Sequence, residues 1–205
     1  MSGIFLRLKT DLCLSQKSSF LEANDELKLK SQITYRKPQP DEAETFAALH
    51  VQCWREAYAE ILPPALMATF STEKRLPMWQ ATLVNPERFV LGAYVDNIPA
   101  GFIISGPSDE KHIPEQDGHL WALYIAALQH RQGIGRTLAY AAMQHWLALG
   151  GSTMTIGVLA ENKPARAFYE SLGAKLLKYN TYNWSGFELP DCLYILDNLA
   201  KIAKV

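Results

Sequence analysis

The sequence predicts one mixed α/β domain that follows a short N-terminal extension. Three observations lead to this prediction. The 205 residues and the hydrophobic fraction of 48% are those of an ordinary globular chain that can bury one core. Strand-type and helix-type hydrophobic patterns succeed one another along residues 32–205. Residues 1–31 have a mixed composition and weak periodicity, so we expect an extension there rather than part of the fold.

The first half of the domain is expected to hold a strand, several helices and a hairpin. Residues 33–37 have the pattern of a strand, and residues 40–60 have the apolar spacing of one side of a helix. Prolines divide residues 61–84 into one or two further short helices. Residues 88–106 indicate a β-hairpin that turns at residues 96–97, where Asp and Asn tolerate a positive φ.

The second half is expected to alternate strands and helices more regularly. Residues 119–126 indicate a strand, which a glycine loop connects to a helix over residues 133–149. A strand over 152–160 and a helix over 162–172 follow, and residues 174–198 indicate two antiparallel strands. The buried stripe of the first of these helices is expected to comprise Leu138, Ala142, Trp146 and Leu149.

Composition excludes several classes of function. The formal net charge is −1 with both signs spread along the chain, so a nucleic-acid partner is not expected. The three cysteines, an odd number and far apart, favour a reducing compartment over disulfides. Histidines and cysteines lack metal-ligand spacing, so no metal is expected. No apolar run is long enough to span a bilayer, so we expect no membrane association and a cytoplasmic location.

The loop at residues 131–137 carries the strongest local signal. Gly133 and Gly135 lie between a predicted strand and a predicted helix, where the N–H groups of a helix N-terminus favour an anion. A dinucleotide-binding fingerprint would need a third glycine where Leu138 stands, and no P-loop motif occurs in the chain. A pyrophosphate seated on the helix N-terminus and a tight turn without a ligand both stay open.

Two motifs together resemble the signatures of the GNAT superfamily of acyl-CoA-dependent N-acetyltransferases. The signature [Q/R]-x-x-G-x-[G/A] at the start of a helix is matched by residues 130–135, with His130 in place of the usual Gln or Arg. The signature N-x-x-A-x-x-F-Y-x-x-x-G-[FA] is matched by residues 162–174. Their order, spacing and surroundings make the pair specific, although either motif alone would be weak. The resemblance covers roughly residues 32–197.

The resemblance implies a mostly antiparallel central sheet that is splayed between its fourth and fifth strands, with helices on both faces. Acetyl-CoA, as co-substrate, would bind in the splay. Its pantetheine arm would pair with the fourth strand and its pyrophosphate would lie on the glycine loop. The residues that the resemblance assigns to the co-substrate are Leu123, Tyr124, Ile125, His130, Arg131, Gln132, Gly133, Ile134, Gly135, Arg136, Thr137, Asn162, Ala165 and Phe168.

Two residues carry the implied chemistry, and each also has a structural interpretation. The resemblance makes Tyr169 the general acid beside the CoA sulfur, whereas its helical spacing also suits a core aromatic. His119 stands where relatives that acetylate lysine have a glutamate base. An imidazole with an ordinary pKa of about 6.5 would also serve, but an ordinary strand-end histidine is the alternative. Strict strand alternation groups Leu120 with Tyr124, and His119 with Leu123 on the opposite face.

The reaction implied is direct transfer of the acetyl group from acetyl-CoA to a primary amine in a ternary complex. A backbone N–H near Ile125 would hold the tetrahedral oxyanion. The acceptor, a small amine or a protein amine, is not identified by the sequence. A catalytically weak GNAT-like module that only binds CoA is the alternative, and nucleotide binding by a Rossmann-like loop is a third. A monomer or a homodimer is expected.

Several residues belong to segments that flank the acceptor site in this family. Glu56 and Glu60 are candidate anchors for an amine, or simply part of a solvated helix face. The aromatic residues of these segments either shape a substrate pocket or pack in the core. They are Trp54, Tyr58, Tyr182, Trp184 and Phe187.

Overall fold

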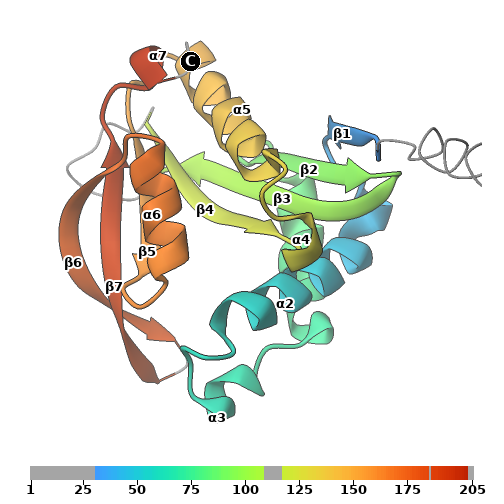
Figure 1. The fold of residues 1–205 in the computed structure, drawn as a ribbon. Helices are drawn as coiled ribbons and strands as arrows, with labels where there is room; N and C mark the ends of the chain where they lie inside the picture. The colour runs from blue at the N-terminus through green and yellow to red at the C-terminus, as the bar shows by residue number, and fades with distance from the viewer. Residues whose placement is uncertain (1–30, 109–116, 185, 203–205) are drawn as a thin grey trace, which may run out of the picture. The chain divides into compact units, whose positions relative to one another are not determined.

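The computed structural model of the chain describes residues 31–108, 117–184 and 186–202 (Figure 1). The expected extension over residues 1–31 lies outside the described residues except for residue 31, and it stays a prediction. The strands are β1 (Ile33–Arg36), β2 (Phe89–Val95), β3 (Ile98–Pro107), β4 (Gly118–Ile125), β5 (Met154–Leu159), β6 (Lys175–Trp184) and β7 (Phe187–Leu196). The α-helices are α2 (Ala43–Tyr58), α3 (Pro64–Met67), α4 (Thr72–Val84), α5 (Ile134–Ala148), α6 (Lys163–Ser171) and α7 (Leu199–Ile202). Two 3-10 turns are η1 (Pro40–Glu42) and η2 (Ala127–Gln129).

The described strands form one sheet in the order β1-β2-β3-β4-β5-β7-β6. All neighbours pair antiparallel except β4 and β5, which run parallel. The β2–β3 hairpin turns at Asp96 and Asn97, with φ values of 50° and 66°, as the sequence predicts. The predicted mixed, mostly antiparallel sheet is therefore confirmed.

Helices cover both faces of this sheet (Figure 1), which confirms the second part of the predicted architecture. On one face, α5 and α6 bury Leu138, Trp146 and Tyr169 against β4, β5 and β7. On the other face, α2 and α4 bury Phe46 and Trp79 against β2 and β3. Each helix is amphipathic, so its apolar stripe covers sheet residues that would otherwise meet water.

The sheet opens between β4 and β5. Only three register pairs join these strands, from Gly118 opposite Met154 to Leu120 opposite Ile156. Beyond them the strands separate, and residues 122–125 of β4 are partly exposed although β4 is a central strand. Gly157 is the exposed residue of β5 at the same level. This opening is the splay that the sequence predicts between the fourth and fifth strands.

A β-bulge changes which residues of β4 share a face. Ile104 of β3 lies opposite Ala122, but Ser105 lies opposite Leu120, so Trp121 is the extra residue. Leu120 consequently packs in the core under α5, on the side of Leu123, while Ala122 and Tyr124 pack toward α2. The expected grouping of Leu120 with Tyr124 was therefore wrong. The extra residue shifts the alternation by one position.

The predicted stripe of α5 also needs one correction. Leu138, Ala142 and Trp146 are buried as expected, whereas Leu149 is 58% exposed. The helix ends at Ala148, and Leu149 is the C-cap residue. Its side chain therefore lies beyond the last turn that packs on the sheet, where the helical period no longer applies.

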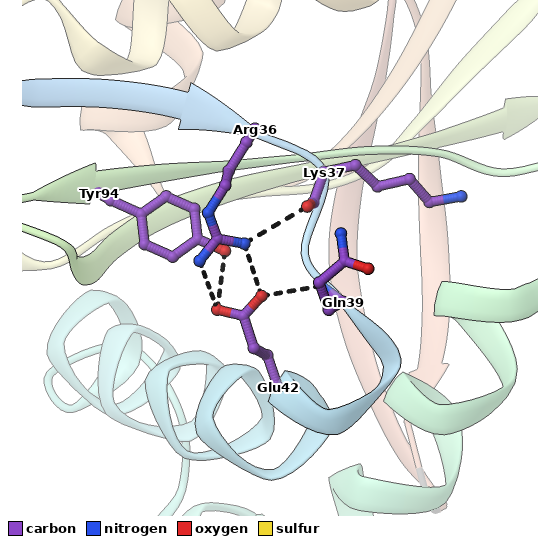
Figure 2. Close-up of polar contacts among 5 residues, drawn as sticks. All are labelled: Arg36, Lys37, Gln39, Glu42 and Tyr94. Atoms are coloured by element: carbon purple, nitrogen blue, oxygen red, sulfur yellow. Dashed lines mark hydrogen bonds and ion pairs between the residues drawn. The ribbon is translucent and has the colours of Figure 1, made fainter.

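A polar cluster fastens β1 to the start of α2 (Figure 2). The Arg36 guanidinium donates two hydrogen bonds to the Glu42 carboxylate, at 2.6 and 2.9 Å, and one to the Lys37 carbonyl. The Gln39 N–H and the Tyr94 hydroxyl also donate to Glu42. Arg36 and these two donors favour the ionised carboxylate and lower the pKa of Glu42 to about 2. Glu42 is thus the common acceptor that joins three segments of the chain.

Glu42→Gln is expected to lower the free energy of unfolding at pH 7 by about 1–2 kcal/mol, because one partner of a charged network is lost. The folded-state pKa of about 2 lies below the ordinary value of 4.5. The contribution of Glu42 is therefore complete above pH 4.5 and fades as the pH falls toward 2. Urea unfolding at pH 7 and pH 3 measures both effects. The same change at exposed Glu44 is the control, and equal losses in the two variants would contradict the expectation.

Candidate active site

The glycine loop connects the open end of β4 to the N-terminus of α5. Gly133 caps the helix with a φ of 82°, and Arg131 has a φ of 65°, so two left-handed residues turn the chain sharply into the helix. A side chain at Gly133 would be strained at this φ, although the space around it is free. The first N–H groups of α5 have no partner within the helix. They form a cradle that suits an anion.

Several loop side chains are tied to the loop itself. His130 donates from Nε2 to the Ile125 carbonyl at 2.8 Å, since a carbonyl can only accept. Gln132 donates to the side chain of Gln129 at 2.8 Å, and the Thr137 hydroxyl donates to the Gly133 carbonyl at 3.3 Å. His130 therefore fixes the loop to the end of β4.

Helix α6 packs against the start of α5 through Phe168. The Asn162 side chain accepts a hydrogen bond from the Ala165 N–H at 3.2 Å, so its predicted capping role is confirmed. A Cβ placed on Gly135 would lie 3.5 Å from the ring of Phe168 and 3.8 Å from Ile125. The second glycine of the loop thus lies close to both α6 and the open end of β4.

Three tyrosines gather at the opening of the sheet. The hydroxyls of Tyr58, on α2, and Tyr124, on β4, are 3.3 Å apart. Tyr169, on α6, is buried on the opposite side of the sheet, and its phenol interacts electrostatically with both. Burial, chiefly, raises the pKa of all three phenols. They are therefore protonated at neutral pH and available as proton donors.

Several polar side chains lie on the α2 side of the neighbouring strands β4, β5 and β7. His119 lies opposite Thr155, and its Nδ1 is 2.7 Å from the Thr155 hydroxyl oxygen. Gly157 follows two residues later on the same face, and the Asp191 carboxylate lies 3.8 Å from where its Cβ would be. We call His119, Thr155, Gly157 and Asp191 the polar row. Because Gly157 has no side chain, the surface of β5 beside the Asp191 carboxylate is not covered by a side chain at that position.

Asp191 differs electrostatically from an ordinary surface carboxylate. It lies half-buried on β7 opposite Leu159, and burial raises its pKa to about 6. Within the described residues, the two ion pairs join Arg36 to Glu42 and Lys175 to Asp197, and neither includes Asp191. A cation bound beside Asp191 would offset the free-energy cost of burying its ionised carboxylate.

The predicted site residues fall into two groups along β4. Tyr124, Tyr169, Asn162 and the glycine loop gather at the open end. His119 lies in the paired part of the strand, five residues from Tyr124, which is about 16 Å at the usual strand rise. The structure therefore does not bring His119 against the tyrosines but against Thr155, whereas Asp191 interacts electrostatically with Tyr58.

Two residues of the candidate site escaped the sequence analysis. Gly157 interrupts an otherwise apolar strand, which is a signal for a close approach of another group. Asp191 is a charged residue within an apolar strand, which is unusual for a buried position.

Glu56, a predicted amine anchor, instead accepts hydrogen bonds from the Ala127 N–H and from Gln52, both at 2.9 Å.

The described cysteines do not suit a covalent route. Burial raises the pKa of the Cys53 thiol to about 12, and burial also raises the pKa of Cys192. Neither is therefore an activated thiolate. Among the residues that the structure describes, no three His, Cys, Asp or Glu side chains gather as metal ligands. The helices of the same residues are also too short or too polar to cross a bilayer.

A mostly antiparallel sheet that opens beside a glycine loop and a buried phenol has the architecture of an acetyltransferase domain. The sequence model of the acetyltransferase (GNAT) family matches residues 46–174, and the chain belongs to this family. The resemblance predicted from the two motifs is thereby confirmed.

The chain is similar to other N-acetyltransferases in sequence and to solved acetyltransferase structures in fold. The chain is 25% identical to the uncharacterized N-acetyltransferase YuaI of Bacillus subtilis over 162 residues, which cover 78% of this chain and 90% of the relative. The PaiA N-acetyltransferase of Thermoplasma acidophilum, solved in complex with coenzyme A, is 21% identical with a TM-score of 0.62, over 81% of this chain and 99% of that one. YncA of Salmonella typhimurium, solved with its cofactor acetyl-CoA, is 16% identical with a TM-score of 0.61, over 82% and 94%.

Proposed function

We propose that this protein is an N-acetyltransferase that moves the acetyl group of acetyl-CoA directly to a primary amine. One observation carries the proposal: the buried phenol of Tyr169 interacts with the two tyrosines at the opening of the sheet, and the N-terminus of α5, which suits an anion, lies beside Phe168 of the same helix α6. The alternative interpretation of the glycine loop as a tight turn without a ligand would require neither an opening in the sheet nor a buried phenol beside it. The solved relatives that contain coenzyme A or acetyl-CoA support the same co-substrate here.

The glycine loop would hold the pyrophosphate. Residues 131–137 supply backbone N–H groups at the N-terminus of α5, with Arg131 and Arg136 exposed beside them. The open edge of β4, residues 123–125, would pair with the pantetheine arm. Asn162, Ala165 and Phe168 would border that arm from α6. This arrangement would bring the thioester between Tyr124 and Tyr169.

The chemistry assigned to the protein is three proton transfers and the stabilisation of an oxyanion. The amine arrives as an ammonium and must lose a proton before attack. Because His119 lies about 16 Å from Tyr124 along β4, it would take this proton through a chain of waters rather than by direct contact. As the new N–C bond forms, a backbone N–H near Ile125 holds the oxyanion. As the carbonyl reforms and the C–S bond breaks, Tyr169 gives its proton to the departing thiolate. The second proton of the attacking nitrogen then leaves and restores the Tyr169 hydroxyl, so that the products are a neutral amide and the free thiol of CoA.

Asp191 has a separate role in this proposal. It is a half-buried carboxylate with a raised pKa that lies beside Gly157 and interacts electrostatically with Tyr58. A carboxylate there would hold the ammonium of the acceptor before His119 removes its proton. Asp191 is thus proposed as the binding residue, and His119 as the base.

The experiment that tests this function measures thiol release from acetyl-CoA with a panel of amines and peptides. We expect release that depends on one class of amine and that produces the N-acetylated amine by mass spectrometry. Acetyl-CoA that binds tightly without thiol release on any acceptor would overturn the proposal in favour of a CoA-binding module. Binding of NAD or ATP without competition by CoA would overturn it in favour of a nucleotide-binding loop.

A further inference from the structure

A small basic pocket lies between α4 and the end of β6. Its volume is about 220 Å³, and its lining residues are Thr69, Phe70, Lys74, Arg75 and Trp184. Two of these side chains are cationic and two are aromatic. A pocket of this composition suits an anionic group attached to a short organic chain.

Arg75 is held in place by the aromatic walls. Its guanidinium carbon lies 4.0 Å from the centre of the Phe70 ring and 5.5 Å from that of Trp184. The side chain is partly buried, and burial lowers the pKa of Arg75. Neither of the two ion pairs among the described residues includes Arg75 or Lys74. The guanidinium is therefore positioned by stacking, and its hydrogen-bond donors have no carboxylate partner in the described protein.

The pocket is connected to the tyrosines of the candidate active site. The ring of Trp184 lies 5.2 Å from that of Trp54, and the ring of Trp54 lies 5.4 Å from that of Tyr58. Arg75 also interacts electrostatically with Tyr124. Two successive ring contacts thus connect the pocket with Tyr58, whose hydroxyl lies 3.3 Å from that of Tyr124.

We propose that this pocket binds a carboxylate of the acceptor, so that the acceptors are amines which carry a carboxylate several bonds from the amine. The inference rests on the proposed function. It gives the two ends of the acceptor opposite partners: Arg75 and Lys74 for the carboxylate, and Asp191 for the ammonium. Trp184, which lines the pocket and is only partly buried, would cover the apolar middle of the acceptor.

The test compares acceptors that differ only in the carboxylate. The first pair is 6-aminohexanoate and hexylamine; the second is a tripeptide with a C-terminal glutamate and the same tripeptide with a C-terminal glutamine amide. In the wild-type protein we expect kcat/KM to be at least about tenfold higher for the carboxylate member of one pair. The pair that shows the preference distinguishes a free amino acid from an acidic peptide. Equal rates within both pairs would overturn the inference.

Arg75→Gln is expected to bring the ratio within the preferred pair close to one. Arg75→Lys, which keeps the charge but loses the planar stacking, should restore part of the preference. Lys201→Gln, which removes an exposed cation on α7, is the control for net charge. A ratio that Arg75→Gln leaves unchanged would overturn the inference, provided that its thermal unfolding matches the wild type. Lys74→Gln, at an exposed position, should lower the same ratio without risk to folding.

A binding measurement separates this inference from the proposed function. Titration of 6-aminohexanoate into the wild-type protein should change tryptophan fluorescence, because Trp184 lines the pocket, and Arg75→Gln should abolish the change. Binding that depends on Arg75, without any acetyl transfer, would uphold the pocket and refute the enzyme. Acetyl transfer that ignores the carboxylate would uphold the enzyme and refute the pocket.

Discussion

Tyr169→Phe is expected to lower kcat for acetyl transfer by about a hundredfold or more, with the Kd for acetyl-CoA changed less than about twofold. The substitution removes only the hydroxyl that is proposed to protonate the thiolate. The phenyl ring keeps its place in the core under α5 and α6, so stability should stay within about 1 kcal/mol of the wild type. Single-turnover kinetics and isothermal titration with acetyl-CoA measure the two quantities separately.

Tyr35→Phe provides the control for Tyr169→Phe. Tyr35 is a partly buried tyrosine on β1, three strands from β4 in the sheet order. It should leave both kcat and Kd unaltered. A Tyr169→Phe enzyme with the wild-type kcat would remove Tyr169 from the acid role and favour its structural interpretation as a core aromatic.

Asp191→Asn is expected to lower kcat/KM for the amine by about thirty- to a hundredfold, mainly through a higher KM. A neutral amide of the same shape cannot pair with the ammonium. The pKa of Asp191 is about 6, so the carboxylate is protonated below pH 6 and ionised above it. In the wild type, kcat/KM should therefore rise as the pH rises through 6, and the variant should lose the part of this rise that comes from Asp191 and keep the part that comes from the base.

Stability gives an independent check on Asp191. Its folded-state pKa lies above the ordinary value of 3.8, so ionisation is disfavoured in the folded protein and lowers stability at neutral pH. Asp191→Asn should consequently be at least as stable as the wild type at pH 7. Glu188→Gln, an exposed change on the same strand, is the matched control. A destabilised Asp191→Asn protein would point to a structural role instead.

His119→Gln separates proton removal from amine binding. The glutamine keeps a polar group near Thr155 but cannot take a proton at neutral pH. We expect kcat to fall by tenfold or more with the KM for the amine little changed, the reverse of Asp191→Asn. An unchanged kcat would assign the base to another group.

The helices and strands of this fold follow closely from local patterns in the sequence. The strand and helix periods, the Asp96-Asn97 turn and the capping Asn162 are all local signals, and each is found where the sequence places it. The two family motifs also predict the glycine loop and the opening of the sheet. Local chemistry is enough for the periods, the turn and the cap because neighbours along the chain determine them. The opening of the sheet is a tertiary feature, and its prediction rests on the family resemblance alone.

Other features depend on residues far apart in the sequence. The bulge at Trp121 arises from the pairing of β4 with β3, and it moves Leu120 to the other face. Asp191 reaches Gly157 only because β7 pairs with β5, and its raised pKa follows from burial by that packing. Arg75 and Trp184 are likewise brought together by tertiary structure. No period or spacing in a single sequence encodes such contacts.

The short parallel pairing between β4 and β5 also has a consequence for how the chain folds. Hairpins such as β2–β3 and β6–β7 close over a few residues, but β4 and β5 meet only after α5 has crossed between them. Pairing over such a separation loses more chain entropy and is therefore slow. Until this pairing forms, the edges of two strands remain available to other molecules. Aggregation during synthesis would thus begin at the strands that the finished enzyme leaves apart.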